Sequence, residues 1–448
     1  MNKNIDLING PIAKSLRQFS FPLAISFVVN IIYAWVDLFF VSKLGEQSVG
    51  AVGASERIWF FIFAVGSGFA IGSSVIVSRR IGERNRDAAR NIAAQSIVGM
   101  LILGIILAVF LYIFKQDILT ILGLKGEIKI LAIEYFNSLI IGVPFNLMMF
   151  QISMIMRSSG NSIYPMQILI GSNIVNAVLT PLLVFGIGPF PRWEVFGAGM
   201  GTSIAQICGS IWAFILLTNK FEVFHHLFNK FKLKFDEILK IVKVGFPASL
   251  QLIAVSVTGL GLTANANLFG TEILSTYIIG MRIDMFVNMS IFAFGAAIEI
   301  VSGQNLGAGQ VKRVFDYHKS AIKQLIIVLL PLSISSFFFG KYIGYLFTSN
   351  PAVIHHLDVY LKFASLANIP FAIGIISIRV ISGAGDYFRS LRVVATILIF
   401  TQLPLAYLSS NYFKSEIGIW ASMLFSMFLF ALISFYTMSK RKWLSKRV

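Results

Sequence analysis

Residues 21–45 read FPLAISFVVNIIYAWVDLFFVSKLG, and residues 246–270 read FPASLQLIAVSVTGLGLTANANLFG, so one pattern occurs twice, 225 residues apart. Both stretches begin with Phe-Pro, continue through an apolar run long enough to cross a bilayer, and end at glycine. The first contains a carboxylate, Asp37, inside the apolar run. The same separation relates Ile81-Gly82 to Leu306-Gly307 and Gly160 to Gly385. The sequence therefore predicts a membrane protein made of two equivalent halves.

The composition agrees with this prediction. Hydrophobic residues make up 56% of the chain and charged residues 13%, and the mean hydropathy is +0.80. A soluble domain is about one quarter charged. Apolar stretches of about 20 residues, the length of a spanning helix, occur twelve times. They begin near Leu16, Val49, Ile92, Ile128, Ile163, Val195, Val244, Ile273, Ala321, Val353, Leu391 and Ile417. The residues before the first stretch lack a small-residue cleavage site, so it is predicted to be an uncleaved span.

The net charge of +17 raises the alternative of nucleic-acid binding, but the positions of the basic residues argue against it. Most of the 37 Lys and Arg fall in segments that face the cytoplasm if both termini do. The predicted outer loops hold only Lys43, Lys115, Lys125, Lys129, Arg192, Lys341 and Lys414. Because basic residues concentrate in cytoplasmic loops, the charge predicts orientation in a plasma (cytoplasmic) membrane, with both termini cytoplasmic and no nucleic-acid partner.

Six spans in each half give the two halves the same orientation, so they are parallel repeats related by an axis along the membrane normal. We predict an all-α integral membrane protein, with twelve transmembrane helices in two pseudo-symmetric six-helix bundles. The predicted domains are the N-terminal bundle, residues 1–218, and the C-terminal bundle, residues 239–448. Residues 219–238 interleave lysine with phenylalanine, which predicts an amphipathic cytoplasmic linker at the inner headgroups. A solvated basic linker is the alternative.

Polar side chains recur at helical spacing in the first span, where Ser26, Asn30, Tyr33 and Asp37 share one helix face. A carboxylate at membrane depth costs about 2.5–3.5 kcal/mol. Asp37 therefore needs water, a cation or a proton, unless it reaches the outer headgroups. The stripe predicts that this helix face lines a polar site inside the protein.

The fifth and sixth spans offer polar groups that complement Asp37. Asn173, Asn176 and Thr180 share a face of the fifth span directly before Pro181. Proline removes a backbone donor, which leaves a carbonyl available to a cation or to water. Thr202 lies early in the sixth span. One asparagine in a span is ordinarily interhelical packing, whereas three oxygens beside a proline indicate a cation site.

The second half has its own polar stripe, on the eighth span. Asp284, Asn288 and Glu299 fall on one face of this span, and Gln251 belongs to a weaker row on the seventh. Glu299 is the deeper carboxylate. Two interpretations of it stay open, a second proton site or a partner for basic side chains at the inner mouth.

Several motifs resemble the multidrug and toxic compound extrusion (MATE) transporters over nearly the whole chain. They are Val36-Asp37-Leu38-Phe39-Phe40-Val41 with Leu44-Gly45, Gly142-Val143-Pro144-Phe145, Arg282-Ile283-Asp284 and Gln304-Asn305-Leu306-Gly307-Ala308-Gly309. The resemblance implies a V-shaped pair of six-helix bundles around a central cavity. It also implies export of organic, often cationic and aromatic, compounds in exchange for H⁺ or Na⁺.

The same resemblance assigns roles to single residues. Asp37 matches the family's first-span carboxylate, Asn176 its fifth-span asparagine and Thr202 its sixth-span threonine. Prokaryotic members often have an aspartate just before the fifth-span proline, where this chain has Thr180. With one carboxylate at the expected site, the coupling ion is predicted to be H⁺, with Na⁺ at Asp37 as the alternative.

The predicted function is secondary active efflux of small organic compounds by antiport, without a cofactor or another metal. The predicted cation-coupling residues are Asp37, Asn176, Thr180 and Thr202, and the predicted substrate-cavity residues are Asn30, Tyr33, Asn173, Gln251, Asn288 and Glu299. The predicted partners are small-molecule substrates and the lipid bilayer, and the protein is predicted to act as a monomer. One alternative is a lipid-linked saccharide flippase of the same superfamily. Another is a membrane-embedded transferase, although metal or nucleophile spacing of Asp, His or Cys is not seen.

Overall fold

The computed structural model describes residues 5–229 and 231–446, and twelve of its helices are long and apolar enough to cross a membrane. This confirms the predicted all-α membrane fold with twelve spans. The spans of the first half are α1 (Ile12–Ser42), α2 (Glu46–Gly82), α3 (Arg86–Ile121), α4 (Gly126–Ser158), α5 (Ile163–Phe185) and α6 (Glu194–Lys220). Those of the second half are α7 (Phe235–Asn267), α8 (Thr271–Gly307), α9 (Val311–Gly344), α10 (Pro351–Gly383), α11 (Tyr387–Ile397) continued by α12 (Leu403–Phe413), and α13 (Ile417–Ser439).

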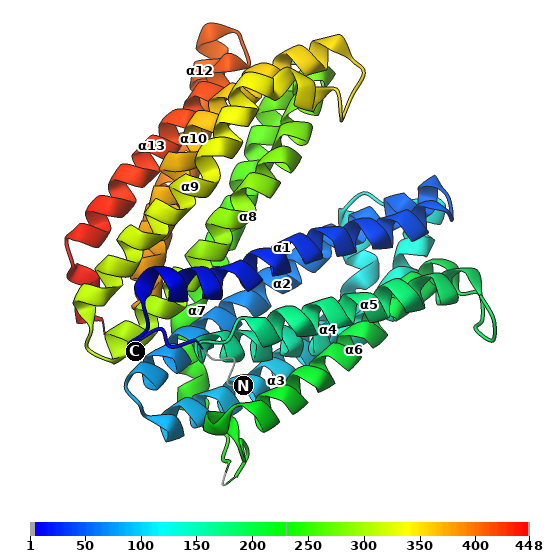
Figure 1. Ribbon diagram of the computed structural model, residues 1–448. Coiled ribbons are helices and arrows are strands. Elements are labelled where there is room, and N and C mark those ends of the chain that lie inside the picture. Colours follow the sequence, from blue (N-terminus) through cyan, green and yellow to red (C-terminus); the bar gives the residue numbers. More distant parts are fainter. Residues whose placement is uncertain (1–4, 230, 447–448) are drawn as a thin grey trace. The chain divides into compact units, whose positions relative to one another are not determined.

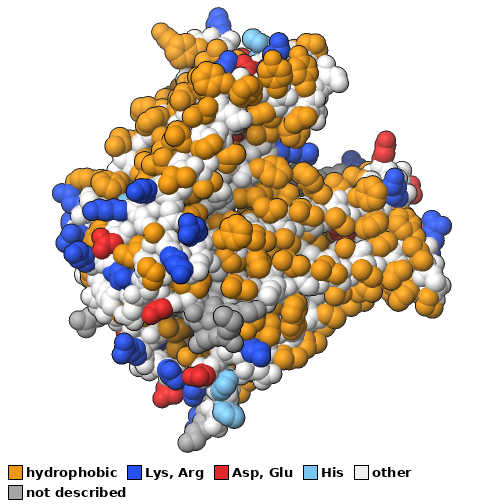
Figure 2. All heavy atoms as spheres, viewed as in Figure 1, with side chains coloured by type: hydrophobic (Ala, Val, Ile, Leu, Met, Phe, Trp, Pro, Cys, Tyr) orange, Lys and Arg blue, Asp and Glu red, His pale blue; other side chains and the backbone are white. Residues whose placement is uncertain are grey.

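Hydrophobic side chains cover the long sides of these helices, whereas lysine and arginine gather toward helix ends (Figure 2). This distribution suits a protein whose flanks contact acyl chains and whose ends contact headgroups and water. Between α11 and α12 the five residues Leu398–Gln402 form a π-helical turn. One residue after the turn comes Pro404, which cannot donate a backbone hydrogen bond.

The helices form two compact units (Figure 1). The first contains Ile25–Ser249 together with residue 5, and the second contains Asp6–Ala24 and the chain from Leu250 onward. The chain passes from one unit to the other inside α1 and inside α7, at positions that again lie 225 residues apart. The predicted domains, 1–218 and 239–448, follow the sequence repeat. The compact units follow packing and assign the first part of α1 to the second unit.

Helix boundaries repeat as closely as the sequence does. The helices α2 and α8 both have 37 residues, and α4 and α10 both have 33. The residues before α2 and α8 are Gly45 and Gly270, with φ of 112° and 103°. Residues other than glycine rarely adopt such values. The repeated glycines therefore mark a turn that each half needs in order to enter its second span.

In the first unit α4 is the central helix, because it packs against α2, α3, α5 and α6. Small residues permit this close packing, as is common between membrane helices. A Cβ on Gly199 of α6 would lie 2.9 Å from the Tyr135 carbonyl oxygen of α4. Polar groups of α4 are bonded across the interfaces, since Gln151 Nε2 donates to Ser73 Oγ at 2.6 Å and to Ser96 Oγ at 3.0 Å.

In the second unit α10 takes the equivalent place and packs against α8, α9, α11 and α13. Asn368 Nδ2 donates to Ser333 Oγ at 3.1 Å, which joins α10 to α9. The aromatic rings of Tyr277, Tyr360 and Trp420 pack in the interior, and Tyr277 stacks on Trp420 with centroids 5.8 Å apart. Hydrogen bonds and aromatic contacts thus fix the order of helices around α10.

The segment before α1 is held on the second unit. The Leu7 carbonyl accepts hydrogen bonds from Asn305 Nδ2 at 3.1 Å and from Tyr317 Oη at 3.0 Å, and the Gly10 carbonyl accepts one from Arg313. Asn305 belongs to the Gln304–Gly309 motif, whose last glycine has a φ of 73° after α8. The motif therefore ends α8, and its Asn305 also holds the segment directly before α1.

The predicted linker lies against the first unit. Arg90 Nε of α3 donates to the Val223 carbonyl at 2.9 Å, and Gln95 Nε2 donates to the Lys232 carbonyl at 2.7 Å. Phe221 and Phe224 are buried. The phenylalanines that suggested an amphipathic segment therefore include two that pack inward on protein.

We expect Gly199→Val to destabilise the protein, because the new side chain must displace Tyr135 or Ser138 of α4. Overpacking of this kind costs about 1–3 kcal/mol. The apparent melting temperature in detergent, followed by fluorescence-detected size-exclusion chromatography, measures the effect. Gly53→Val is the matched control, since nothing lies within 4 Å of a Cβ at Gly53. Equal melting temperatures for the two variants would contradict the close contact between α4 and α6.

Candidate functional site

Three helices of the first unit meet at the hydroxyl of Thr202. Tyr33 Oη of α1 donates to Thr202 Oγ1 at 3.1 Å, and Asn176 Nδ2 of α5 donates to the same oxygen at 3.0 Å. The Thr202 hydroxyl lies 3.2 Å from the Ala198 carbonyl, which accepts its proton. Three of the residues singled out in the sequence are therefore in direct contact, although they are separated by up to 169 positions.

Asp37 lies one helical turn beyond Tyr33 on the same face of α1. Its side chain is buried, with 8% of the residue exposed. Thr180 is fully buried on α5, and its Oγ1 would lie 2.8 Å from a Cβ on Gly201, the neighbour of Thr202 in α6. Pro181 follows Thr180 and lacks the N–H that would bond to the carbonyl four residues earlier, that of Ala177. The proline-containing part of α5 thus faces the start of α6.

Two oxygens in this cluster lack hydrogen-bond partners among the described residues. They are Asn176 Oδ1 and Thr180 Oγ1, and both are buried. A buried acceptor without a partner costs about 1–3 kcal/mol, so such groups usually indicate water or an ion. Oxygen ligands suit small hard cations. The residues present therefore fit a proton carried by Asp37, an ordered water or Na⁺.

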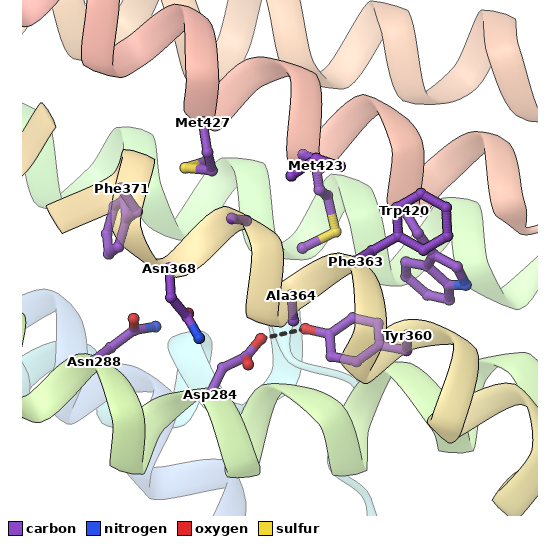
Figure 3. Close-up of a pocket in the computed structure, with 12 residues that line it drawn as sticks. Asp284, Asn288, Tyr360, Phe363, Ala364, Asn368, Phe371, Trp420, Met423 and Met427 are labelled. Atoms are coloured by element: carbon purple, nitrogen blue, oxygen red, sulfur yellow. Dashed lines mark hydrogen bonds between the residues drawn. The ribbon is translucent and has the colours of Figure 1, made fainter. Parts of the chain in front are cut away.

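The second unit contains a pocket of about 140 Å³ between α8, α10 and α13 (Figure 3). Asp284 Oδ2 accepts a hydrogen bond from Tyr360 Oη at 2.5 Å. Asn288 of α8 and Asn368 of α10 lie beside Asp284 and line the same pocket. Asn288 Oδ1 is buried without a partner among the described residues. The remaining lining is apolar and includes the aromatic and thioether side chains of Phe363, Phe371, Trp420, Met423 and Met427.

Glu299 belongs to a separate cluster in the second unit. Arg379 Nη1 of α10 lies 2.7 Å from Glu299 Oε2, and Tyr387 of α11 donates its hydroxyl proton to Glu299 Oε1. Gln251 Nε2 of α7 reaches the Tyr387 carbonyl at 3.4 Å. Only 6% of the Glu299 side chain is exposed. Glu299 therefore has a basic partner, Arg379, in this structure, and both interpretations of its role in transport stay predictions.

The remaining residues of the predicted cavity lie in different surroundings. Asn173 Nδ2 is 3.5 Å from the Val29 carbonyl of α1, and Asn30 is exposed. Asn288 lines the pocket of the second unit. The structure thus joins Tyr33 to Asn176 and Thr202, and it places Gln251 with Glu299. The residues predicted to line one substrate cavity therefore do not all lie together.

The sequence analysis placed Asp284 on a polar stripe but did not assign it to a site. Its partner Tyr360 and the nearby Asn368 were missed altogether. Both come from α10, far along the chain from Asp284. The available signal was the carboxylate itself, because an ionisable side chain inside a span is a functional candidate by default.

A known protein family matches each half of the chain separately. The MatE family profile matches residues 22–182 and 247–408, two segments that start 225 positions apart. The probable multidrug resistance protein YoeA of Bacillus subtilis is 24% identical over 421 residues, covering 91% of this chain and 89% of that protein. The multidrug export protein MepA of Staphylococcus aureus is 24% identical over 412 residues, covering 92% and 90%.

Solved structures show the same fold. A multidrug resistance MATE family transporter of the MOP superfamily, in an outward-facing conformation, aligns with a TM-score of 0.90 at 24% identity, covering 99% of each chain. A MOP superfamily transporter from Pyrococcus furiosus, described as having a binding pocket of reverse polarity, gives the same TM-score, identity and coverage.

We expect Arg379→Met to destabilise the protein by about 3–5 kcal/mol, because it leaves Glu299 charged and buried without its partner. The double variant Glu299→Gln with Arg379→Met should recover much of that loss, since neither charge remains. Apparent melting temperatures of the two single variants and the double variant measure the coupling between the residues.

The matched control is the exposed pair Arg192–Glu194, with an N–O distance of 3.1 Å. Arg192→Met should leave the melting temperature almost unchanged, because exposed pairs contribute about 0–1 kcal/mol. Single-variant losses at Glu299 and Arg379 that simply add in the double variant would argue against a coupled ion pair.

Proposed function

This chain belongs to the MatE family of membrane transporters, and on that premise we propose that it is a multidrug efflux transporter that exports small organic, cationic or aromatic compounds by antiport. Its relatives YoeA and MepA are both named for multidrug resistance or export. Family membership makes the protein a transporter and not an enzyme. The saccharide-flippase alternative is not favoured by any of these relationships.

The observation that carries the proposal is the polar cluster of the first unit. Asn176 bonds to Thr202, Thr180 lies one turn beyond Asn176 on α5, and Asp37 lies one turn beyond Tyr33, which also bonds to Thr202. Two buried oxygens, Asn176 Oδ1 and Thr180 Oγ1, have no partner among the described residues. Alternating access requires a site whose occupant changes the balance between two conformations. A carboxylate beside hydroxyl and amide groups serves this purpose, because gaining a proton changes which hydrogen bonds the cluster can make.

We favour H⁺ over Na⁺ as the coupling ion. A dehydrated Na⁺ is held best by several oxygens that include more than one negative charge. In this cluster Asp37 is the acidic residue, and Thr180 stands where a second carboxylate would add charge. Protonation of Asp37 removes its own charge and needs no second anion.

The pocket in the second unit supports an aromatic, cationic substrate. Asp284 offers a negative charge, and Trp420 and Phe371 offer aromatic faces. Met423 and Met427 can repack around ligands of different shapes. A volume of about 140 Å³ is close to that of a cavity that holds benzene. One ring of a substrate therefore fits here, with Asn288 as a polar contact.

The proposed setting is the plasma membrane, with both termini cytoplasmic and the single chain as the functional unit. The support for this orientation is the arrangement of basic residues, with most Lys and Arg in the segments predicted to be cytoplasmic. Cysteine labelling from each side of the membrane at Ser445 and at Gly188 tests it.

We expect Asp37→Asn to fold and to abolish ethidium export driven by a pH gradient in proteoliposomes, because the amide cannot gain and lose a proton. Asp117→Asn, which removes an exposed carboxylate of α3, should transport at the wild-type rate. Imposed pH gradients in potassium buffer, and Na⁺ gradients at constant pH, separate the two ions. Full export by Asp37→Asn would remove the residue from the mechanism, and wild-type export driven by Na⁺ alone would overturn the H⁺ assignment.

Thr180→Asp should make transport depend on Na⁺, because it adds a second carboxylate next to Asn176 and Thr202. The expected result is export under a Na⁺ gradient at constant pH, which the wild type does not show. Thr180→Asn, of similar size but uncharged, is the control. A Thr180→Asp protein that folds and stays indifferent to Na⁺ would show that charge at this position does not select the ion.

A further inference from the structure

A groove of about 560 Å³ lies along the second unit between α9 and α13, away from the transport pocket. Its long walls are apolar and include Ile322, Ile326 and Phe435. Its end is basic, with Lys319, Lys323 and Arg441. The proposed transport function uses none of these residues.

The spacing along α9 brings basic and apolar side chains to the same groove. Lys319, Ile322, Lys323 and Ile326 are separated by three or four positions and so share one helix face. Asp316, the acidic residue of α9, does not line the groove. Among the described lining residues none is acidic, so the cations are not neutralised within the groove.

Arg441 follows the end of α13 with a φ of 55°. Glycine ordinarily occupies this left-handed position, and another residue there costs about 1–2 kcal/mol. The Arg441 guanidinium carbon lies 4.9 Å from the centroid of the Phe315 ring. The chain therefore turns back at Arg441 and places a cation over an aromatic ring at the groove.

The polar groups buried at and beneath the groove already have hydrogen-bond partners. His318 is buried and lies 3.0 Å from Ser377 Oγ of α10. Trp443 is buried beside Phe315 and donates its indole N–H to the Met438 carbonyl at 2.7 Å. The groups left to recognise a ligand are thus the apolar walls and the three cations.

The geometry points to a bound anionic phospholipid, with its phosphate at Lys319, Lys323 and Arg441 and its acyl chains along Ile322, Ile326 and Phe435. The outer edge of the groove is suited to a bilayer, since 64% of Ile327 and 49% of Phe435 are exposed. Lysine and arginine gather at this end of the second unit (Figure 2), which is predicted to face the cytoplasm. Basic pockets between helices at this level bind lipid headgroups.

An anionic lipid would contact both the apolar walls and the basic end of the groove, whereas other occupants would match only one of them. Free phosphate would use the cations but not the apolar walls. A neutral lipid would use the walls but not the three cations, which repel one another when unpaired. The volume lies in the range of about 300–1,000 Å³ that ligand pockets occupy.

Native mass spectrometry of the delipidated protein tests the proposal, using phosphatidylglycerol and phosphatidylcholine with the same acyl chains. We expect the wild type to bind the first phosphatidylglycerol at least tenfold more tightly than phosphatidylcholine. The triple variant Lys319→Gln, Lys323→Gln, Arg441→Gln should lose that preference. Ile326→Trp, which narrows the apolar part, should weaken binding of both lipids.

The matched control is Lys312→Gln, Lys440→Gln, Lys442→Gln, which removes three exposed charges near the same end of the unit but outside the groove. It should keep the preference for phosphatidylglycerol. Equal binding of the two lipids by the wild type, or equal losses in both triple variants, would overturn the proposal. Displacement of phosphatidylglycerol by millimolar inorganic phosphate would also overturn it, because the groove would then be a phosphate site.

Discussion

The cost of a polar group without a partner inside a bilayer governs this structure. Every backbone N–H and C=O at membrane depth must be bonded within the protein, so the spanning segments are helices. The same requirement applies to side chains. Gln151, Asn368 and Glu299 each lie at a helix interface and each is bonded to a neighbouring helix. The helices that pack around α4 and α10 are therefore also those whose donors and acceptors match across the interfaces.

The two units share a backbone plan and differ in how they use it. Ser74 of α2 and Glu299 of α8 are 225 positions apart, yet Ser74 bonds to Ser158 at 2.8 Å and Glu299 pairs with Arg379. The position of Asp37 corresponds to Leu262, and that of Asp284 corresponds to Trp59. Each unit thus has a carboxylate inside a span at a position where its counterpart has none. The proposed division between a coupling site in the first unit and a substrate pocket in the second agrees with this asymmetry.

The fold could be predicted from the sequence because apolar stretches and the 225-residue repeat are visible in the order of residues alone. Periodicity also put Tyr33 and Asp37 on one face of α1, since a helix fixes the direction of side chains. Periodicity could not predict which other helix packs against this face of α1. Tyr360 and Arg379 both lie on α10, and their contacts with α8 depend on how the two helices are rotated and how far they are shifted along each other. The groove beside α13 depends further on the reversal of the chain at Arg441, which no periodic pattern signals.

Asn176 Oδ1 and Thr180 Oγ1, which have no partner among the described residues, allow the energy available to the proposed coupling to be bounded. Each costs about 1–3 kcal/mol while unsatisfied. A cation or an ordered water that bonded to both would stabilise this arrangement by about 2–6 kcal/mol before its own desolvation is counted. Every 1.4 kcal/mol of that difference changes a conformational equilibrium about tenfold. A ligand with equal affinity for both conformations would shift nothing. In the proposed mechanism, the coupling strength would depend on how differently the two conformations satisfy these two oxygens.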